Sequence, residues 1–427
     1  MKPLHLTTRP SKEKILLVVI DYKFERSVWS VDQVKEEMKE LVEACGGEVI
    51  DSIVCHLEKP TASYLISTGK LQEIQSFCLA NPVDTVIFSR DLKGSQQRNL
   101  EDAFGIKTID RTQLILDIFA RHATSSEGKM QVELAQLEYL LPRLVGKGIE
   151  LSRLGGGIGT MGPGETKLEV DRRRISDRIA KLKKDLKEVT QSRQVKRKKR
   201  QNDQIPLIAL VGYTNAGKST LLNTLTKAGT VTNDGLFTTL DSLSRLYVLP
   251  SKRKVVFCDT VGFMHDLPHR LIESFKATLE EVQQADLLVH VMDISHPNFK
   301  NYYEAVVSVL TELDVLEKPT IIILNKMDKL QDRGWMASVS AQFPNSVLLS
   351  GLNGENMAQL LERLDVMLSD GMEEIDVKIP MGRMDLVNLA HQEGNVKEIK
   401  YLSNSIRIHA LVPKKIAAQF KSQNTVK

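Results

Sequence analysis

The chain has few cysteines, few aromatic residues and no long apolar run. Its 427 residues include four cysteines in apolar settings without metal-ligand spacing: Cys45, Cys55, Cys78 and Cys258. We therefore expect reduced buried thiols rather than disulfides or a cysteine metal site. No apolar run approaches bilayer-spanning length, and the first residues show no signal segment. These absences predict a cytoplasmic protein without an integral membrane span, with peripheral membrane association left open.

A large excess of charge of one sign is also lacking. Charged residues make up 26% of the chain, hydrophobic residues 42%, and the formal net charge is only +4. These proportions are typical of a soluble globular protein, and the length allows two to four domains. Aromatic residues make up 5%. They are not interleaved with the basic segments, which argues against a protein that stacks the bases of single-stranded RNA.

A phosphate-binding loop is the strongest motif present. It follows an apolar run at residues 207–211, which predicts a buried strand, and it precedes a helical pattern. The glycines let backbone N–H groups turn toward an anion. Lys218 can reach the β- and γ-phosphates, and the Ser219 hydroxyl can ligate Mg²⁺. The loop comprises Gly212, Tyr213, Thr214, Asn215, Ala216, Gly217, Lys218 and Ser219.

Three further predicted strands end in polar motifs, in the order expected of a guanine nucleotide-binding domain. Asp259 can hold Mg²⁺ through water, and the Gly262 N–H can contact the γ-phosphate. The Asp328 carboxylate can accept two hydrogen bonds from guanine, whereas adenine would leave it unpaired, so we predict GTP rather than ATP. Backbone N–H groups of the last motif can meet guanine O6. The motifs are Asp259, Thr260, Val261 and Gly262; Asn325, Lys326, Met327 and Asp328; and Ser350, Gly351 and Leu352.

A switch segment lies between the first two motifs and contains Phe237, Thr238, Thr239, Leu240 and Asp241. One of its two threonines can complete the Mg²⁺ shell when the γ-phosphate is present, and spacing alone does not separate them.

The residue after Gly262 is Phe263, which cannot orient a water as glutamine does in many GTPases. We therefore expect slow intrinsic hydrolysis unless another group supplies the missing polar function. His265 is near but reads more simply as a surface residue. Our hypothesis is that the Asn215 side chain helps to bind K⁺. Equal rates of GTP turnover in K⁺ and in Na⁺ would contradict this hypothesis.

The fold class predicted is α/β. Alternating strands and helices indicate a small N-terminal α/β domain over residues 1–113. Residues 114–204 follow as a helical hairpin, with helical patterns at about 114–145 and 167–199 expected to pair antiparallel. A P-loop GTPase domain with a mostly parallel sheet and helices on both faces fills residues 205–370. Residues 371–427 form a small C-terminal α/β domain, expected as strand–helix–strand–strand.

The hairpin carries two further signals. Its tip, residues 155–165, is rich in glycine, and could be a flexible hinge or a loop that lies close to a nucleic-acid backbone. Its second helix is basic at both ends, at residues 172–174 and 196–200. A basic helix face is often simply solvated, but it can also contact phosphates. Together the two signals favour a structured RNA partner.

Four stretches resemble the HflX family of translational GTPases, and the likeness covers nearly the whole chain. They are residues 97–101 (QRNLE), 110–119 (DRTQLILDIF), 128–137 (GKMQVELAQL) and 155–173, which includes GGGIG and GPGETKLEVDRR. A hydrophobic residue at the position of Phe263 also fits the family. Departures are Met161 for a usual arginine, Lys93-Gly94 for serine-proline, and Gly351 for alanine.

The resemblance implies a GTPase that binds the large ribosomal subunit and its ribosomal RNA, splits stalled or stress-damaged ribosomes, and is stimulated by the ribosome. It implies that the glycine-rich loop reaches toward the peptidyl-transferase centre. It carries over the nucleotide contacts named above, with Ser219 and Thr239 as Mg²⁺ ligands and Lys218, Thr239 and Gly262 as catalytic. A monomer is expected. Two alternatives stay open: a GTPase of large-subunit assembly, and a nucleotide-gated RNA-binding protein with incidental turnover.

Overall fold

The computed structural model describes residues 12–24, 29–146, 167–203, 205–226, 243–266, 276–368 and 372–422. Two compact units divide the chain, one formed chiefly by Met1–Arg193 and the other chiefly by residues from Gln194 onward. Within the described ranges, no helix is long and apolar enough to cross a bilayer. The division into four domains drawn from the sequence stays a prediction.

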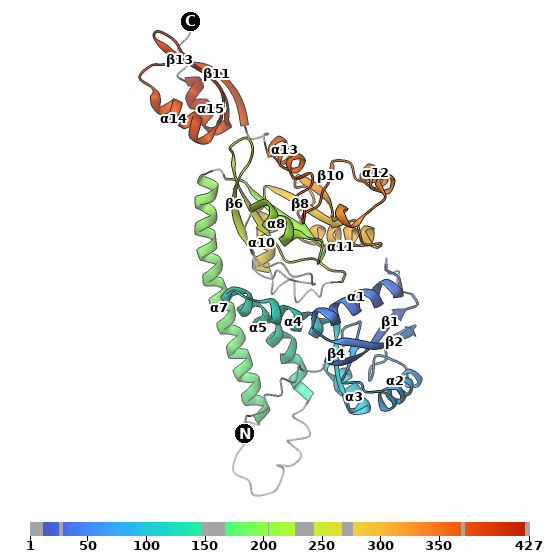
Figure 1. The fold of residues 1–427 in the computed structure, drawn as a ribbon. Coiled ribbons are helices and arrows are strands. Elements are labelled where there is room, and N and C mark those ends of the chain that lie inside the picture. Colours follow the sequence, from blue (N-terminus) through green and yellow to red (C-terminus); the bar gives the residue numbers. More distant parts are fainter. Residues whose placement is uncertain are drawn as a thin grey trace, which may run out of the picture. The chain divides into compact units, whose positions relative to one another are not determined.

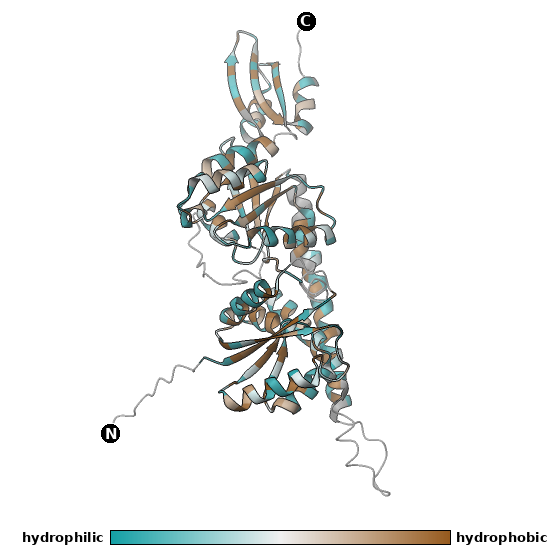
Figure 2. Ribbon diagram, turned by 90° about the vertical axis from the view of Figure 1, so that its right-hand side faces the viewer, coloured by the Kyte–Doolittle hydropathy of each residue, from teal (hydrophilic) through white to brown (hydrophobic). Residues whose placement is uncertain are grey.

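The first unit contains a four-stranded parallel sheet in the order β2-β1-β3-β4 (Figure 1). The central strand β1 is almost continuously apolar, as expected for a parallel strand covered on both faces, and Figure 2 shows this sheet as brown strands between mixed helices. The strands are β1 (Lys14–Tyr22), β2 (Glu48–Leu57), β3 (Thr85–Phe88) and β4 (Lys107–Asp110), and the helices between them are α1 (Val31–Ala44), α2 (Thr68–Ala80) and α3 (Gly94–Phe104).

The start and end of α1 follow from single residues. Ser30 caps it through a capping box, in which Gln33 N–H donates to the Ser30 hydroxyl at 3.3 Å and Ser30 N–H donates to Gln33 Oε1 at 2.8 Å. Gly46, with a φ of +75°, follows the last turn. A cap-forming serine followed three residues later by glutamine, and a glycine after the last turn, are local signals that the sequence itself carries.

The prediction of a single long helix over about residues 114–145 is wrong. The chain forms α4 (Arg111–His122), α5 (Ser126–Leu140) and a 3₁₀ segment, η1 (Leu141–Gly146). The break has a local cause, because the Ser125 side chain accepts a hydrogen bond from Gly128 N–H at 2.9 Å and so begins a new helix. The apolar spacing continued across the break, which is why periodicity did not reveal it.

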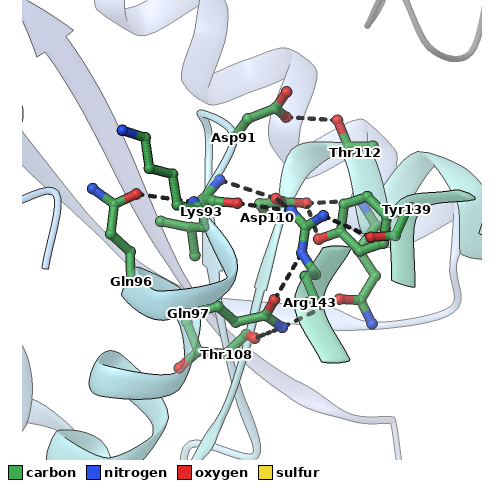
Figure 3. Close-up of polar contacts among 11 residues, drawn as sticks. Asp91, Lys93, Gln96, Gln97, Thr108, Asp110, Thr112, Tyr139 and Arg143 are labelled. Carbon is green, nitrogen blue, oxygen red and sulfur yellow. Dashed lines mark hydrogen bonds and ion pairs between the residues drawn. The ribbon is translucent and has the colours of Figure 1, made fainter. Parts of the chain in front are cut away.

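A buried carboxylate joins these elements (Figure 3). Asp110 is the N-cap of α4 and accepts hydrogen bonds from Gln113 N–H at 2.9 Å and Leu92 N–H at 3.0 Å. It also accepts from the Tyr139 hydroxyl at 2.8 Å and from the Arg143 guanidinium at 3.0 Å. Burial raises the pKa of the Asp110 carboxyl, and these backbone donors and Arg143 oppose that shift. The network fastens the end of α5 and η1 to β4 and α3.

Helix α7 (Lys167–Asn202) pairs antiparallel with α5, as the sequence predicts. Their seam contains Leu134, Ile179 and Leu182, with further apolar residues partly buried beside it. Three ion pairs flank the seam: Arg193 with Glu127 at 2.7 Å, Lys183 with Glu138 at 2.7 Å and Arg178 with Glu133 at 2.6 Å. Part of the basic charge of α7 is therefore used to hold the hairpin together.

The second unit contains a six-stranded sheet in the order β10-β9-β8-β5-β7-β6, parallel except for the edge strand β6. Side chains alternate along β8 and β9, so that Val289 and Ile323 pack with α8 and α13 on one face, whereas Met292 and Leu324 pack with α11 and α12 on the other. The strands are β5 (Leu207–Gly212), β6 (Ser244–Val248), β7 (Lys254–Asp259), β8 (Leu287–Asp293), β9 (Thr320–Asn325) and β10 (Ser346–Leu348). The helices are α8 (Lys218–Thr226), α10 (Lys276–Gln284), α11 (Phe299–Glu312), η2 (Met327–Lys329), α12 (Arg333–Gln342) and α13 (Met357–Leu368).

The C-terminal part forms a three-stranded antiparallel sheet in the order β11-β13-β12. The expected strand–helix–strand–strand pattern is present but incomplete, because a last helix, α15, was not predicted. Phe420 and Ala417 of α15 are fully buried against Ile408 and its neighbours, so this short helix is held by packing rather than by a strong local signal. The elements are β11 (Met372–Pro380), α14 (Met384–Glu393), β12 (Asn395–Tyr401), β13 (Ser405–Pro413) and α15 (Lys414–Ser422).

Candidate nucleotide-binding site

The loop between β5 and α8 requires two of its glycines. Gly212 has a φ of +153° and Gly217 a φ of +94°. A Cβ on Gly212 would lie 2.3 Å from the Val291 carbonyl oxygen, and one on Gly217 would lie 2.3 Å from Asn325 Nδ2. Asn215, at the exposed crest of the loop, has a φ of 60°, which asparagine tolerates better than most residues. The backbone thus takes a tight turn at the carboxyl end of a parallel strand, where such sheets bind ligands.

Lys218 is buried within this loop, with only 6% of its surface exposed. Its ammonium donates to the carbonyl oxygens of Gly212 at 3.0 Å and Tyr213 at 2.8 Å. Burial lowers the pKa of Lys218 to about 8, and the neighbouring Asp259 carboxylate opposes that shift. A phosphate anion beside the ammonium would favour the charged form and raise the pKa again. The side chain is therefore placed to gain from an anionic ligand.

Ser219 and Asp259 meet although they lie 40 residues apart. The Ser219 hydroxyl donates to Asp259 Oδ2 at 2.6 Å, from the first turn of α8 to the end of β7. A hydroxyl oxygen and a buried carboxylate form the kind of all-oxygen donor set that suits Mg²⁺, which keeps several waters and needs few protein ligands. Among the described residues there is no cluster of three or more carboxylate, histidine or cysteine side chains for a metal. The residues present fit Mg²⁺ held partly by a phosphate and water.

The side of the site that the sequence predicts to bind the base is built around Asn325. Its Nδ2 donates to the Ala216 carbonyl at 2.8 Å, and its Oδ1 accepts from Gly351 N–H at 2.8 Å. One buried amide therefore joins the phosphate loop to the segment after β10. Asp328 is exposed beside it and accepts a hydrogen bond from the buried Ser350 hydroxyl at 2.6 Å. Leu352, at the end of this segment, is 69% exposed.

The segment after β7 lies against the phosphate loop. A Cβ on Gly262 would stand 2.8 Å from Thr214 Cα and 3.1 Å from Lys218 Nζ, so only glycine fits. Phe263 is 1% exposed, and its backbone exchanges hydrogen bonds with the loop. Thr260 donates from its hydroxyl to the Leu210 carbonyl at 2.7 Å, and Val261 is buried. No polar side chain stands at the position where glutamine is common.

Three residues near the site escaped the sequence reasoning. Asp293 forms an ion pair with Lys326, whose Nζ lies 2.8 Å from Asp293 Oδ2. Because Asp293 is a polar residue at the end of the apolar strand β8, its position in the sequence could have revealed it. His290 is buried, and burial lowers its pKa to about 3 with the Lys218 charge adding to the shift. Tyr302 stacks on Tyr213. The last two carried no local signal, because only the folded sheet brings them close.

Several predicted residues lie outside the described parts of the chain. They are Phe237, Thr238, Thr239, Leu240 and Asp241 of the switch segment, and residues 155–165 of the glycine-rich loop. The structure brings together the other predicted nucleotide contacts, from Gly212 to Leu352, at the carboxyl ends of β5, β7, β9 and β10.

A mostly parallel sheet, a lysine-bearing phosphate loop and a separate Asn–Asp motif for the base define a P-loop GTP-binding protein. Family models agree: "50S ribosome-binding GTPase" matches residues 207–326, "GTP-binding GTPase N-terminal" residues 32–120 and "GTP-binding GTPase Middle Region" residues 122–200. GTPase HflX of Caldanaerobacter subterraneus subsp. tengcongensis is 43% identical over 411 residues, which span 96% of this chain and 94% of that protein. GTPase HflX of Escherichia coli (strain K12) is 41% identical over 346 residues, or 81% of each. The chain belongs to the HflX family of GTPases.

Among solved structures, a GTP-binding protein of the archaeon Sulfolobus solfataricus in complex with GDP is similar, with 26% identity. The match covers 84% of this chain and 99% of that chain, at a TM-score of 0.42.

Proposed function

We propose that this protein is an Mg²⁺-dependent GTPase whose GTP state binds the large ribosomal subunit and dissociates stalled or stress-damaged ribosomes. Hydrolysis of GTP to GDP and phosphate then permits its release. The observation that carries the ribosomal part is the match of residues 207–326 to a family model described as a 50S ribosome-binding GTPase. The expectations of a monomer and of a cytoplasmic protein belong to the same proposal.

The chain's own residues have distinct roles in this proposal. Lys218 neutralises phosphate charge, and the Gly262 N–H contacts the γ-phosphate. Ser219 and Thr239 are the Mg²⁺ ligands, with Asp259 bound to the metal's water shell. Bound Mg²⁺ would supply charge that offsets the developing negative charge on the phosphates. Asp328 reads guanine, and the other predicted nucleotide contacts named above would touch the bound nucleotide.

The buried Phe263 sets the expected kinetics. Since its side chain is 1% exposed and apolar, it cannot position the attacking water. Turnover by the protein alone should then be slow and should rise when a partner completes the site. Asn215, at the exposed crest of the loop, is the residue that we propose to assist K⁺ binding.

Basic residues on α7 support contact with ribosomal RNA. Arg178, Lys183 and Arg193 pair with α5, but Arg172, Lys181, Lys184 and Lys187 are exposed on the same helix. Exposed cations along one long helix suit phosphate contacts, whose affinity falls as salt rises.

The test compares GTP turnover with and without purified large ribosomal subunits, in K⁺ and in Na⁺. We expect strong stimulation by the subunits and faster turnover in K⁺. Subunit separation is followed by sedimentation of intact ribosomes with GTP, with GDP as the control. Tight nucleotide-dependent binding without stimulation would favour the gated RNA-binding protein. Accumulation of immature particles on depletion, without splitting, would favour the assembly role.

A further inference from the structure

Tyr213 joins the phosphate loop to two other segments through its side chain. It is 4% exposed, although the tyrosine stands in a loop. Its ring stacks on Tyr302 of α11, with centroids 4.0 Å apart and planes within 2°. Its hydroxyl accepts a hydrogen bond from the His265 backbone N–H at 3.1 Å. One side chain thus contacts both α11 and the segment that follows Gly262.

The segment after Gly262 is held to the loop by two backbone bonds as well. Phe263 N–H donates to the Gly212 carbonyl at 3.0 Å, and Thr214 N–H donates to the Phe263 carbonyl at 2.8 Å. These bonds can form with almost any residue at position 213, because they use only the main chain. The Tyr213 hydroxyl adds a third bond that depends on the side chain.

The Tyr302 ring, on which Tyr213 stacks, is itself packed against a further ring. Tyr302 stacks against His296, with centroids 4.6 Å apart, and its hydroxyl lies 3.3 Å from His296 Nε2. Stacked aromatic rings of this kind restrict one another beyond simple burial. The stacked rings therefore restrict the Tyr213 side chain in the orientation in which its hydroxyl meets the His265 backbone.

We propose that Tyr213 is a positioning residue for GTP hydrolysis. Through its hydroxyl it keeps the His265 backbone, and with it Phe263, packed on the phosphate loop. Gly262 directly precedes Phe263, and a Cβ on it would lie 3.1 Å from Lys218 Nζ, so the same contact also keeps the Gly262 N–H close to the lysine. Since Phe263 offers no polar group, the position of this backbone N–H matters more here than in an enzyme that has the glutamine. The inference rests on the proposed hydrolysis of GTP.

A purely structural role for Tyr213 predicts different behaviour. If the tyrosine only filled the core beneath α11, loss of its hydroxyl would change stability or nucleotide affinity and would not selectively change kcat. A positioning role predicts a lower kcat at unchanged GDP affinity, because GDP lacks the γ-phosphate.

The test is Tyr213→Phe, which keeps the ring and its stacking but removes the hydroxyl. We expect partner-stimulated kcat to fall about fivefold, as the loss of one neutral hydrogen bond implies, and the GDP dissociation constant to change less than about twofold. The matched control is Tyr303→Phe, which removes the hydroxyl of the next tyrosine of α11, whose ring packs against His290 and Phe343 instead of Tyr213. It should alter neither quantity.

Amide hydrogen exchange provides the second measurement, which does not depend on turnover. With a non-hydrolysable GTP analogue bound, His265 and its neighbours should exchange faster in Tyr213→Phe and at the wild-type rate in Tyr303→Phe. Unchanged exchange, unchanged kcat, or parallel losses of kcat and GDP affinity would each overturn the positioning role. Wild-type protein that binds GTP but never hydrolyses it would instead refute the proposed function, and exchange would still decide whether Tyr213 holds the segment.

Discussion

The Ser350 hydroxyl donates a hydrogen bond to Asp328 Oδ1 at 2.6 Å. Ser350 is fully buried and Asp328 is exposed, so a fixed donor holds a carboxylate that faces outward from the end of the sheet. The carboxylate then has a set orientation before any base arrives. Preorganisation of this kind strengthens recognition, because little side-chain freedom is lost on binding.

Asp328→Asn should change the preferred base. Guanine presents two donors to the carboxylate, and an amide can accept only one of them and would oppose the other with its own N–H. We expect GDP affinity to fall about a hundredfold and affinity for xanthosine diphosphate, which carries an oxygen in place of the 2-amino group, to rise. Fluorescent-nucleotide titration measures both. Glu317→Gln, an exposed control, should behave as wild type, and an unchanged preference in Asp328→Asn would remove Asp328 from base recognition.

Lys218 should take up a proton when a nucleotide binds at alkaline pH. Burial lowers its pKa to about 8, and nearby phosphates raise it again. Near pH 8.5 part of the free protein carries a neutral lysine, whereas the bound form carries the ammonium. GDP affinity should accordingly weaken as the pH rises above 8. Calorimetric titrations at pH 8.5 in buffers of different ionisation enthalpy should give different apparent enthalpies, while those at pH 7 should agree. Equal values at pH 8.5 would contradict the lowered pKa.

Some features of the fold could be predicted from the sequence and others could not. The two groups differ in the interactions that produce them. Strand ends followed by glycine, lysine or aspartate were readable because the chemistry of the loop is local, as at Gly212 to Ser219. Ser30 was readable as a cap for the same reason. The break at Ser125 was missed because apolar periodicity runs through it, and α15 was missed because its stability comes from burial of Phe420. Tyr302 joins the site only through tertiary stacking, which no spacing encodes.

His290 should make the protein sensitive to acid. Burial lowers its pKa to about 3 in the folded state, whereas an unfolded histidine titrates near 6.5. The unfolded state therefore binds the proton first, so the full stability is present above pH 6.5 and is lost as the pH falls from 6.5 toward 3. At pH 5 the loss from this group is about 2 kcal/mol.

His290→Phe keeps an aromatic ring beside Tyr303, on which the histidine stacks with centroids 5.2 Å apart. Chemical denaturation at pH 7 and pH 5 should show a smaller difference between the two pH values in this variant than in wild type. His391→Gln, at an exposed histidine, should keep the wild-type difference. An equal difference in all three proteins would show that other groups account for the acid sensitivity.

Asp110 should be a stability determinant of the first unit. It is fully buried and accepts from Leu92, Gln113, Tyr139 and Arg143 (Figure 3). Asp110→Ala would leave the Arg143 guanidinium, 15% exposed and 3.3 Å from the Tyr139 ring, without its carboxylate. Loss of one member of a buried charge pair costs about 3–5 kcal/mol. Denaturant unfolding of the variant should report that loss, while Asp102→Ala, at an exposed carboxylate of α3, should stay within about 0.5 kcal/mol of wild type.

The double variant Asp110→Ala/Arg143→Leu separates the contribution of the Asp110–Arg143 ion pair to stability from that of the other hydrogen bonds of the network. Removing both charges should recover part of the lost stability, because the uncompensated guanidinium is gone. If Asp110→Ala were as stable as Asp102→Ala, the network of Figure 3 would not fasten α5 and η1 to the sheet. The motif at residues 110–119, which resembles the HflX family, would then need a role other than stability. Measuring the affinity of Asp110→Ala for ribosomes would test whether that role is ribosome binding.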